Sequence, residues 1–527
     1  MPLTVITGGL TLSYVKASPN PYSDVEPDSE IPAYNEVPLA HAHQYNGKKF
    51  LPIMGSAIID VDNDGISELF LAGGENQNDV IYNYSGEKGF VALTDIGINK
   101  KNDDATYGAS VVDMNNDGKD DLLLARDSGG YIYFNEGASF REQKIDLFLN
   151  KKSRVASFSP GDINADGHID LYVNAYLARE AMEGQNIFNK EGYGATSVLL
   201  LNNGDNTFKD ITKSSGIHYV HNTFLGIFVD MDEDNDLDLV VAHDTGHVKT
   251  WKNNGDLTFT DTKNPFSDVY GYPMGIAAGD YNNNGNIDFY FSNVGPTAPK
   301  MLASGDLKDD QVFHTDLMLM ENQGNMQFVD SSQKAKLADY EFSWGTTMAD
   351  LNLDGRQDIL IAENYVSLPF QKIFKLPGRM LLQRSDGTFA SVEKEAGVVN
   401  KNYEIAPLLA DFNGDGYLDQ IRVNLSGTTR AFISKGGEHK FLKVKLPSTA
   451  TFLGSKVEVT MSDGTKKYDW HLSGEGLCSD QEHTMVFGLG KSLVPNTIAV
   501  TLPNGQKLSK NVAGQSLVEW KFDEATL

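Results

Sequence analysis

Cysteine is almost absent from this chain of 527 residues, which has a single one at position 478. One cysteine cannot form an internal disulfide, and it excludes thiolate metal clusters and redox motifs built from paired cysteines. Its ordinary role is that of a small buried hydrophobic residue. Stability therefore has to come from packed cores, which a content of 40% hydrophobic and 10% aromatic residues can supply.

Long apolar runs and an excess of positive charge are also missing. No window of about 18 apolar residues occurs, so no membrane-spanning helix is expected. Acidic residues outnumber basic ones by 72 to 44, and the net charge of −28 argues against nucleic acid or an anionic membrane surface as the main partner.

The N-terminal stretch lacks the positive region of a secretory signal, because its first basic residue, Lys16, follows the short apolar run instead of preceding it. Two localisations stay open. We expect a cytoplasmic protein if Met1 is the natural start, and a secreted or periplasmic one if a leader was removed.

Much of the negative charge lies in seven copies of a nine-residue motif. Acidic or amide residues occupy its positions 1, 3, 5 and 9, and position 6 is Gly in six copies and Asn235 in the fourth. Alternating oxygen ligands suit Ca²⁺, which accepts roughly six to eight of them, and the sharp turn at position 6 predicts a positive φ there.

Each copy supplies four candidate metal ligands, so up to seven calcium ions are expected. A carboxylate count of four in the fourth loop and two in the fifth predicts the tightest and the weakest binding, respectively. Repetition in every unit indicates ions that are mainly structural. The candidate ligands are Asp60, Asp62, Asp64, Glu68, Asp113, Asn115, Asp117, Asp121, Asp162, Asn164, Asp166, Asp170, Asp230, Asp232, Asp234, Asp238, Asp280, Asn282, Asn284, Asp288, Asp350, Asn352, Asp354, Asp358, Asp411, Asn413, Asp415 and Asp419.

The residues around the motif predict strands. An EF-hand needs a Glu at position 12, and no copy has one. Short apolar runs precede and follow the loops, and several units continue to an Asn/Gly turn and a Phe, as in NNGDLTF ending at Phe259. Four antiparallel strands per unit, repeated every 49 to 70 residues, are typical of β-propeller blades, with an open solenoid as the alternative.

These motifs resemble the FG-GAP or VCBS repeats of calcium-loop propellers, also found in integrin α heads, over about residues 50–435. The tail resembles the ASPIC/UnbV domain in FLGSKVEV from Phe452, GEGLCSDQ from Gly474 and VFGLGK from Val486, although Leu502 replaces the Trp that commonly precedes Pro. The resemblance implies an architecture like that of the cartilage acidic proteins, whose usual role is calcium-supported binding. A few members of similar architecture alkylate aromatic or carboxylate nucleophiles with alkyl halides.

We therefore expect an all-β protein with three parts. Residues 51–437 form a seven-bladed β-propeller with calcium loops. Residues 1–50 supply a strand that closes the ring, and residues 438–527, which alternate apolar and polar positions, form a small C-terminal β domain.

The face opposite the acidic loops is the candidate binding surface. In a four-stranded blade the ends of the second strands reach that face, where segments 176–197, 294–316 and 365–379 form long inserts. Tyr107, Asp244 and Tyr272 belong to the same rim, although ordinary packing competes with function for every such residue. The candidate catalytic residues there are Arg126, Asp127, Arg154, His218, His221, His243, Tyr340, Trp344, Glu363 and Tyr403.

Two hypotheses for function follow. The first is a binding protein that presents this face to a protein, glycan or small molecule. The second is an enzyme of specialised metabolism, for example an alkylating one, with a pocket on that face or between the propeller and the C-terminal domain. Asp469 and His471 could act as an acid–base pair there, with packing as the competing interpretation, and no GxSxG, P-loop, HExxH or Rossmann motif occurs.

Overall fold

The computed structural model describes residues 20–98, 100–101, 103–182, 187–297, 303–364 and 376–521. Within these ranges the named helices are two short 3-10 turns, η1 (Gly86–Lys88) and η2 (Arg179–Ala181), and the remaining elements are strands. None of the helices in this part of the chain is long and apolar enough to cross a membrane. The predicted all-β class is confirmed.

Seven sheets, which we number 1 to 7, form the main body; each has four antiparallel strands, and sheet 1 has a fifth strand, β34 (Ser479–Asp480), that pairs in parallel. Sheet 1 contains β2 (Ser56–Ile59), β3 (Glu68–Leu71), β4 (Val80–Tyr84) and β5 (Phe90–Ala92). Sheet 2 contains β6 (Thr106–Val112), β7 (Asp121–Arg126), β8 (Gly129–Asn135) and β9 (Phe140–Ile145). Sheet 3 contains β10 (Ser153–Gly161), β11 (Asp170–Leu177), β12 (Val198–Asn202) and β13 (Phe208–Asp210).

The next three sheets repeat this order of successive strands. Sheet 4 contains β14 (Asn222–Val229), β15 (Asp238–Asp244), β16 (Val248–Asn253) and β17 (Phe259–Thr262). Sheet 5 contains β19 (Ile276–Gly279), β20 (Asp288–Phe291), β22 (Met318–Asn322) and β23 (Phe328–Asp330). Sheet 6 contains β24 (Ser343–Ala349), β25 (Asp358–Glu363), β26 (Arg379–Gln383) and β27 (Phe389–Ser391).

Sheet 7 combines the two ends of the repeat region. It contains β28 (Tyr403–Ala410), β29 (Asp419–Ser426) and β30 (Arg430–Ser434), and its fourth strand is β1 (Tyr34–Val37) from the N-terminal segment. Tyr34 pairs with Ser434 and Val37 with Ala431. The N-terminal strand thus covers an edge of sheet 7 that would otherwise expose unpaired backbone groups.

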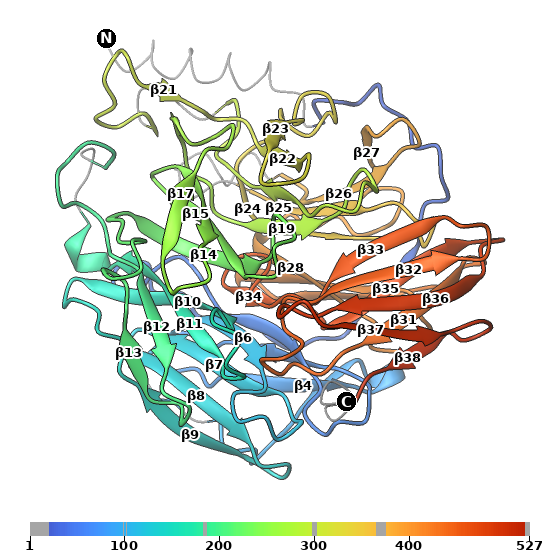
Figure 1. The fold of residues 1–527 in the computed structure, drawn as a ribbon, viewed down its shortest axis with the longest axis horizontal. Coiled ribbons are helices and arrows are strands. Elements are labelled where there is room, and N and C mark those ends of the chain that lie inside the picture. The colour runs from blue at the N-terminus through green and yellow to red at the C-terminus, as the bar shows by residue number, and fades with distance from the viewer. Residues whose placement is uncertain are drawn as a thin grey trace.

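The first strands of neighbouring sheets approach one another closely at glycine positions. β2, β6, β14 and β19 are buried along their whole length. A Cβ on Gly108 would lie 2.4 Å from Ala156 O, and one on Gly345 would lie 2.6 Å from Ile405 O, so these positions need glycine for the close approach. Figure 1 shows the sheets arranged around a centre near β34, as in a propeller. The propeller-type architecture is confirmed, and closure of seven blades into a complete ring stays a prediction.

The C-terminal strands form a separate small core. One sheet contains β31 (Lys440–Lys445), β35 (Thr484–Gly490) and β38 (Leu517–Glu519), and another contains β33 (Lys466–Trp470), β32 (Lys456–Met461), β36 (Pro495–Thr501) and β37 (Lys507–Asn511). Leu442, Val457, Phe487 and Ile498 are among the side chains buried between them. In Figure 1 this C-terminal domain, in orange and red, overlies one side of the sheets.

A segment of the C-terminal domain, residues 473–482, enters the centre of the seven sheets, and we call it the axial segment. Its strand β34 (Ser479–Asp480) pairs in parallel with β2. Gly476 exchanges backbone hydrogen bonds of 2.8 and 3.0 Å with Ile276, and Cys478 O accepts from Ala109 N–H at 3.2 Å. Leu409 N–H donates to Gln481 Oε1 at 3.1 Å. The axial segment therefore hydrogen-bonds to the first strands of sheets 1, 2, 5 and 7.

Candidate functional site

The seven acidic loops share one backbone geometry. In the second loop, Asp117 N–H donates to Asp113 Oδ1 at 3.1 Å and Gly118 N–H donates to Asp113 Oδ2 at 2.7 Å. Position 6 has a positive φ in every loop, including 72° at Asn235, which confirms the prediction. Position 4 is also left-handed in every loop, for example 57° at Asn116, a feature that the sequence analysis missed.

In six of the seven loops the aspartate at position 9 joins the loop to the third strand of its sheet. Asp121 Oδ2 accepts from Met114 N–H at 3.0 Å, and Asp121 Oδ1 accepts from Asn135 N–H at 2.7 Å. The side chain is fully buried, and burial raises the pKa of Asp121 to about 8. The same two links recur at Asp170, Asp238, Asp288, Asp358 and Asp419. This carboxylate thus supports the fold whether or not it also binds a metal ion.

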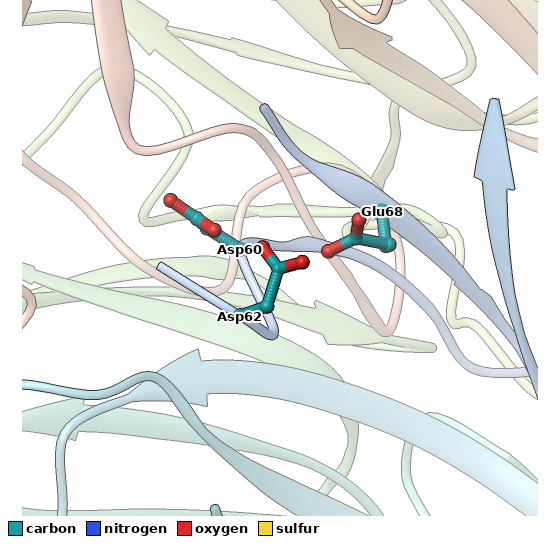
Figure 2. A group of neighbouring side chains, drawn as sticks. All are labelled: Asp60, Asp62 and Glu68. Atoms are coloured by element: carbon teal, nitrogen blue, oxygen red, sulfur yellow. The ribbon is translucent and has the colours of Figure 1, made fainter. Parts of the chain in front are cut away.

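Two loops bring three carboxylates especially close together. Figure 2 shows the side chains of Asp60, Asp62 and Glu68 as neighbours, and one oxygen from each lies within 4.8 Å of the others. The carboxylates of Asp230, Asp232 and Asp234 meet the same limit. Converging carboxylate oxygens are the donor set that a hard cation such as Ca²⁺ prefers, so the residues fit that ion.

Lysines of the C-terminal domain contact the acidic loops directly. Lys445 Nζ lies 2.6 Å from Asp60 Oδ2, and Lys443 Nζ is bonded to Asp411 Oδ2. Lys456 Nζ lies 2.6 Å from Glu233 Oε1 in the fourth loop. The C-terminal domain therefore covers the face that carries the loops.

Buried amides connect neighbouring sheets, and the sequence analysis treated them only as turn residues. Asn135 Nδ2 donates to Val61 O at 2.8 Å, which joins sheet 2 to the loop of sheet 1. Asn253, Asn322 and Gln383 make the equivalent bond to the preceding sheet's loop, at 2.9, 2.9 and 2.6 Å. The available signal was an amide at the end of the strand before each Gly turn, as in NEG, NNG and NQG.

The candidate catalytic residues on the opposite rim form separate local groups. Arg126 is buried and lies 2.8 Å from Asp79, and Glu363 lies 2.5 Å from Arg379, so two of them belong to buried ion pairs. Asp127 and Arg154 form a partly exposed pair at 3.0 Å.

The aromatic and histidine candidates are likewise spread over several sheets. His243 is fully buried and its Nδ1 lies 2.9 Å from Thr223 Oγ1, while His221 lies beside it and His218 is exposed. Trp344 and Tyr403 have ring centroids 6.1 Å apart, and Tyr340 lies under the Arg379 guanidinium. The structure thus does not gather the ten candidates into one centre.

A cavity of about 670 Å³ opens on this face, at the ends of β11 and β15. Its walls include Tyr176, Tyr193 and Tyr272, and Asp244 and Asn222 lie at its base. Asp244 and Tyr272 were noted on this rim from the sequence, but Tyr176 and Tyr193 were missed. Their only signal was membership of the first long insert.

The first predicted insert forms part of the cavity wall, and the second insert is tied to it. The Asp306 carboxylate accepts from the N–H groups of Ile187, Phe188 and Asn189 at 3.1, 2.8 and 3.0 Å, which ties the insert 294–316 to the insert 176–197. A short parallel pair, β18 (Val269–Tyr270) with β21 (Val312–Phe313), attaches the second insert to the segment before sheet 5. Of the third insert, residues 365–375 lie outside the described residues.

Asp244 is the buried charged group of the cavity. The Tyr176 hydroxyl donates to Asp244 Oδ2 at 2.5 Å, and Asp244 Oδ1 meets no donor at hydrogen-bonding geometry in the described ranges. Burial raises the pKa of Asp244 to about 6, against contacts with Tyr176 and the Thr245 N–H that favour the ionised form. The carboxylate is therefore charged near neutral pH, and its Oδ1 is buried.

A second, smaller cavity of about 80 Å³ lies between the sheets and the C-terminal domain. Asp469, His471 and Glu475 line it, so the structure does bring the Asp469 and His471 pair to the domain interface. Burial raises the pKa of Asp469 to about 7 and that of Glu475 to about 8.

Comparison with known families identifies both parts of the chain. Residues 60–124, 113–173 and 230–291 match the FG-GAP-like repeat, and residues 446–526 match the ASPIC and UnbV domain. The chain therefore carries FG-GAP-like repeats followed by an ASPIC/UnbV domain, as the sequence motifs predicted.

Relatives align with most of the chain. The chain is 23% identical over 522 residues to human cartilage acidic protein 1, covering 90% of this chain and 73% of that protein. It is 24% identical over 509 residues to the Xenopus tropicalis protein of the same name, covering 87% and 71%. An Agrocybe aegerita lectin that recognises non-reducing terminal N-acetylglucosamine is 17% identical, with a TM-score of 0.41 over 71% of this chain and 93% of the lectin. That score is too low to bear on function.

Proposed function

We propose that this protein is a calcium-stabilised binding protein whose ligand occupies the face opposite the acidic loops. The observation that carries the proposal is the cavity of about 670 Å³ beside Asp244. It is concave, lined by aromatic and a few polar groups, and built from inserts on a rigid scaffold, which are the usual properties of a ligand site. The C-terminal domain covers the other face and leaves this one accessible.

The acidic loops are proposed to hold Ca²⁺ in a structural role. In each loop the side chains at positions 1, 3, 5 and 9, which the sequence analysis named, would supply the oxygens. A bound ion would neutralise carboxylates that otherwise repel one another. Support comes from the close carboxylates of the first and fourth loops.

The ligand class within this proposal is a protein, a glycan or a small molecule. A small molecule is favoured because the cavity has a volume of about 670 Å³ and its lining combines aromatic side chains with the buried residue Asp244. Cartilage acidic protein 1 shares the architecture, but its name identifies no ligand for this chain.

The proposal is tested by screening the calcium-loaded protein against small molecules, glycans and alkyl halides with phenols, by thermal shift and by mass spectrometry. We expect a non-covalent ligand that raises the melting temperature of the wild type. The variant Tyr272→Ala, which opens the cavity wall, should lose that shift, whereas Tyr84→Ala on sheet 1 should keep it. A hit that is unaffected by Tyr272→Ala would place binding elsewhere, and a new covalent product would support the alkylating-enzyme alternative.

A further inference from the structure

A carboxylate oxygen of Asp244, at the base of the cavity, lacks a hydrogen-bond donor in the described ranges. Asp244 Oδ1 is buried and unpaired in the described ranges, while Oδ2 already accepts from Tyr176. A buried carboxylate oxygen without a donor carries a large desolvation cost. A ligand that brings N–H groups to this oxygen would remove that cost.

Tyrosine rings surround this acceptor and are held in place by other aromatic side chains. Tyr176 stacks on Phe224 with ring centroids 4.7 Å apart. Tyr272 packs edge-on against Phe188 at 5.6 Å and against Phe313 at 6.2 Å, and its hydroxyl donates to Ala303 O at 2.7 Å. Because the rings are fixed before any ligand arrives, little side-chain entropy is lost on binding.

Rings of this kind attract cations. The face of a tyrosine ring is negative, and an ammonium group near it gains a further attraction beyond its hydrogen bonds. The net charge of −28 adds a long-range potential that favours cationic ligands over anionic ones.

The mouth of the cavity has the opposite charge. Lys48 and Arg179 line it and both are exposed. Arg179 is oriented by a hydrogen bond from its Nε to Gly47 O at 3.2 Å. A ligand that carried only a positive charge would be repelled by Lys48 and Arg179. A ligand that also carried an acidic group could pair that group with them.

We propose that the cavity binds a small organic zwitterion, with its ammonium group against Asp244 and the tyrosine rings and its acidic group beside Lys48 and Arg179. The inference rests on the proposed binding function of this cavity and adds the chemical class of the ligand. The separation between the two charged groups of the ligand is left to the experiment, which uses a series of chain lengths.

The test measures binding of ω-amino acids of four, six and eight carbons to the full calcium-loaded chain by titration calorimetry, beside hexylamine, hexanoate and N-acetylglucosamine. We expect one ω-amino acid to bind best, hexylamine to bind more weakly and hexanoate to bind weakest. Asp244→Asn, which keeps the shape and one acceptor, should weaken the amino acid and hexylamine by roughly tenfold or more. Arg179→Gln should weaken the amino acid and leave hexylamine unchanged.

Asp261→Asn is the matched control, because Asp261 is an exposed carboxylate on the outer strand of the same sheet and pairs with Lys249. It should bind like the wild type. If Asp244→Asn does not fold, judged by its melting temperature, the Arg179→Gln comparison and the three wild-type probes still decide the question.

The outcomes separate the two proposals. Binding of N-acetylglucosamine in place of the amines, lost in Tyr272→Ala, would overturn the zwitterion and keep the cavity as a binding site. Equal binding of hexanoate and the ω-amino acids would also overturn the zwitterion. If no probe binds at millimolar concentration and the screen of the proposed function also gives no hit at Tyr272, both proposals fail.

Discussion

Lys445 of the C-terminal domain places its ammonium group 2.6 Å from Asp60 Oδ2, the first carboxylate of the first acidic loop. The pair joins two parts of the chain that are 385 residues apart. Asp60 is buried and Lys445 is largely so, which makes the contact more valuable than a surface ion pair. The loop therefore interacts with a cation that the protein itself supplies.

Substitution of this lysine should reveal whether the loop also binds calcium. Lys445→Met is expected to destabilise the calcium-free protein by about 1–3 kcal/mol, because it leaves the Asp60 carboxylate without its cationic partner. In millimolar calcium the variant should lose less stability, since a bound ion would compensate the negative charge of Asp60. Differential scanning calorimetry with EDTA and with calcium measures both values, and Lys466→Met, an exposed pair within the C-terminal domain, is the control. An equal loss in the two conditions would contradict calcium binding at this loop.

Substitutions in the axial segment should strongly reduce the stability of the protein. Asp480 Oδ2 accepts from Val111 N–H at 2.7 Å and from Ser473 Oγ at 2.6 Å, and Oδ1 accepts from Gly474 N–H at 2.9 Å. Asp480→Ala leaves these buried donors unsatisfied and is expected to cost about 2–5 kcal/mol. Urea unfolding measures the loss. Asp480→Asn, which keeps an acceptor, should lose less, and Asp463→Ala in an exposed turn should change little; a small effect of Asp480→Ala would show that the segment is not tightly held.

The buried amides between sheets give a prediction with an adjacent control. Asn253 Nδ2 donates to Ile163 O at 2.9 Å, and its Oδ1 accepts from Gly255 N–H at 3.1 Å. Asn253→Ala is expected to destabilise the protein by about 2–3 kcal/mol, whereas Asn254→Ala, at an exposed position in the same turn, should cost well under 1 kcal/mol. Thermal unfolding compares the two variants, and similar losses would contradict a role in joining sheets 3 and 4.

Glu475 should make the stability of the domain interface depend on pH. Burial is the main cause that raises its pKa to about 8, and Asp469 and Asp480 raise it further, while the Ala278 N–H and His483 act in the other direction. The pKa of Glu475 is higher in the folded protein than in the unfolded chain, so folding favours its protonated form. The resulting contribution of Glu475 to stability is present in full below about pH 4.5 and is lost as the pH rises through about 8.

Replacement of Glu475 by Gln should therefore raise the unfolding midpoint relative to the wild type at pH 9 by more than at pH 6. Urea titrations at both pH values measure the difference. Glu438→Gln, at an exposed pair with Lys491, controls for the general effect of removing a negative charge. A midpoint difference that stays constant between pH 6 and pH 9 would contradict titration of Glu475 at the interface.

Local features of this molecule could be predicted from the sequence because their causes are local. The alternation of acidic residues with a Gly or Asn at position 6 predicts a tight loop, and the positive φ of Asn235 confirms it. The apolar runs on each side predict strands, and the structure has β14 and β15 around that loop. The four ligand positions in each loop remain predictions.

Long-range features could not be predicted in the same way. Nothing near Arg126 in the sequence indicates Asp79 as its partner, and nothing in the C-terminal domain indicates that Cys478 reaches Ala109. The cavity was predicted only as a face with inserts. The first insert is held by Asp306, which accepts from the backbone of Phe188 more than 100 residues earlier, a tertiary contact without a local pattern.

The pairing of β1 with β30 and the entry of the axial segment also determine the order in which strands can pair during synthesis. The strand of Tyr34 can pair only after Ser434 has been made, and the pairing of Ser56 with β34 requires Ser479. Until the C-terminal domain leaves the ribosome, the first strands face an unfilled centre and sheet 7 has no completed edge. Residues made more than 400 positions later thus finish the first sheet, so a chain stopped before residue 479 would leave even its earliest sheets without their final contacts.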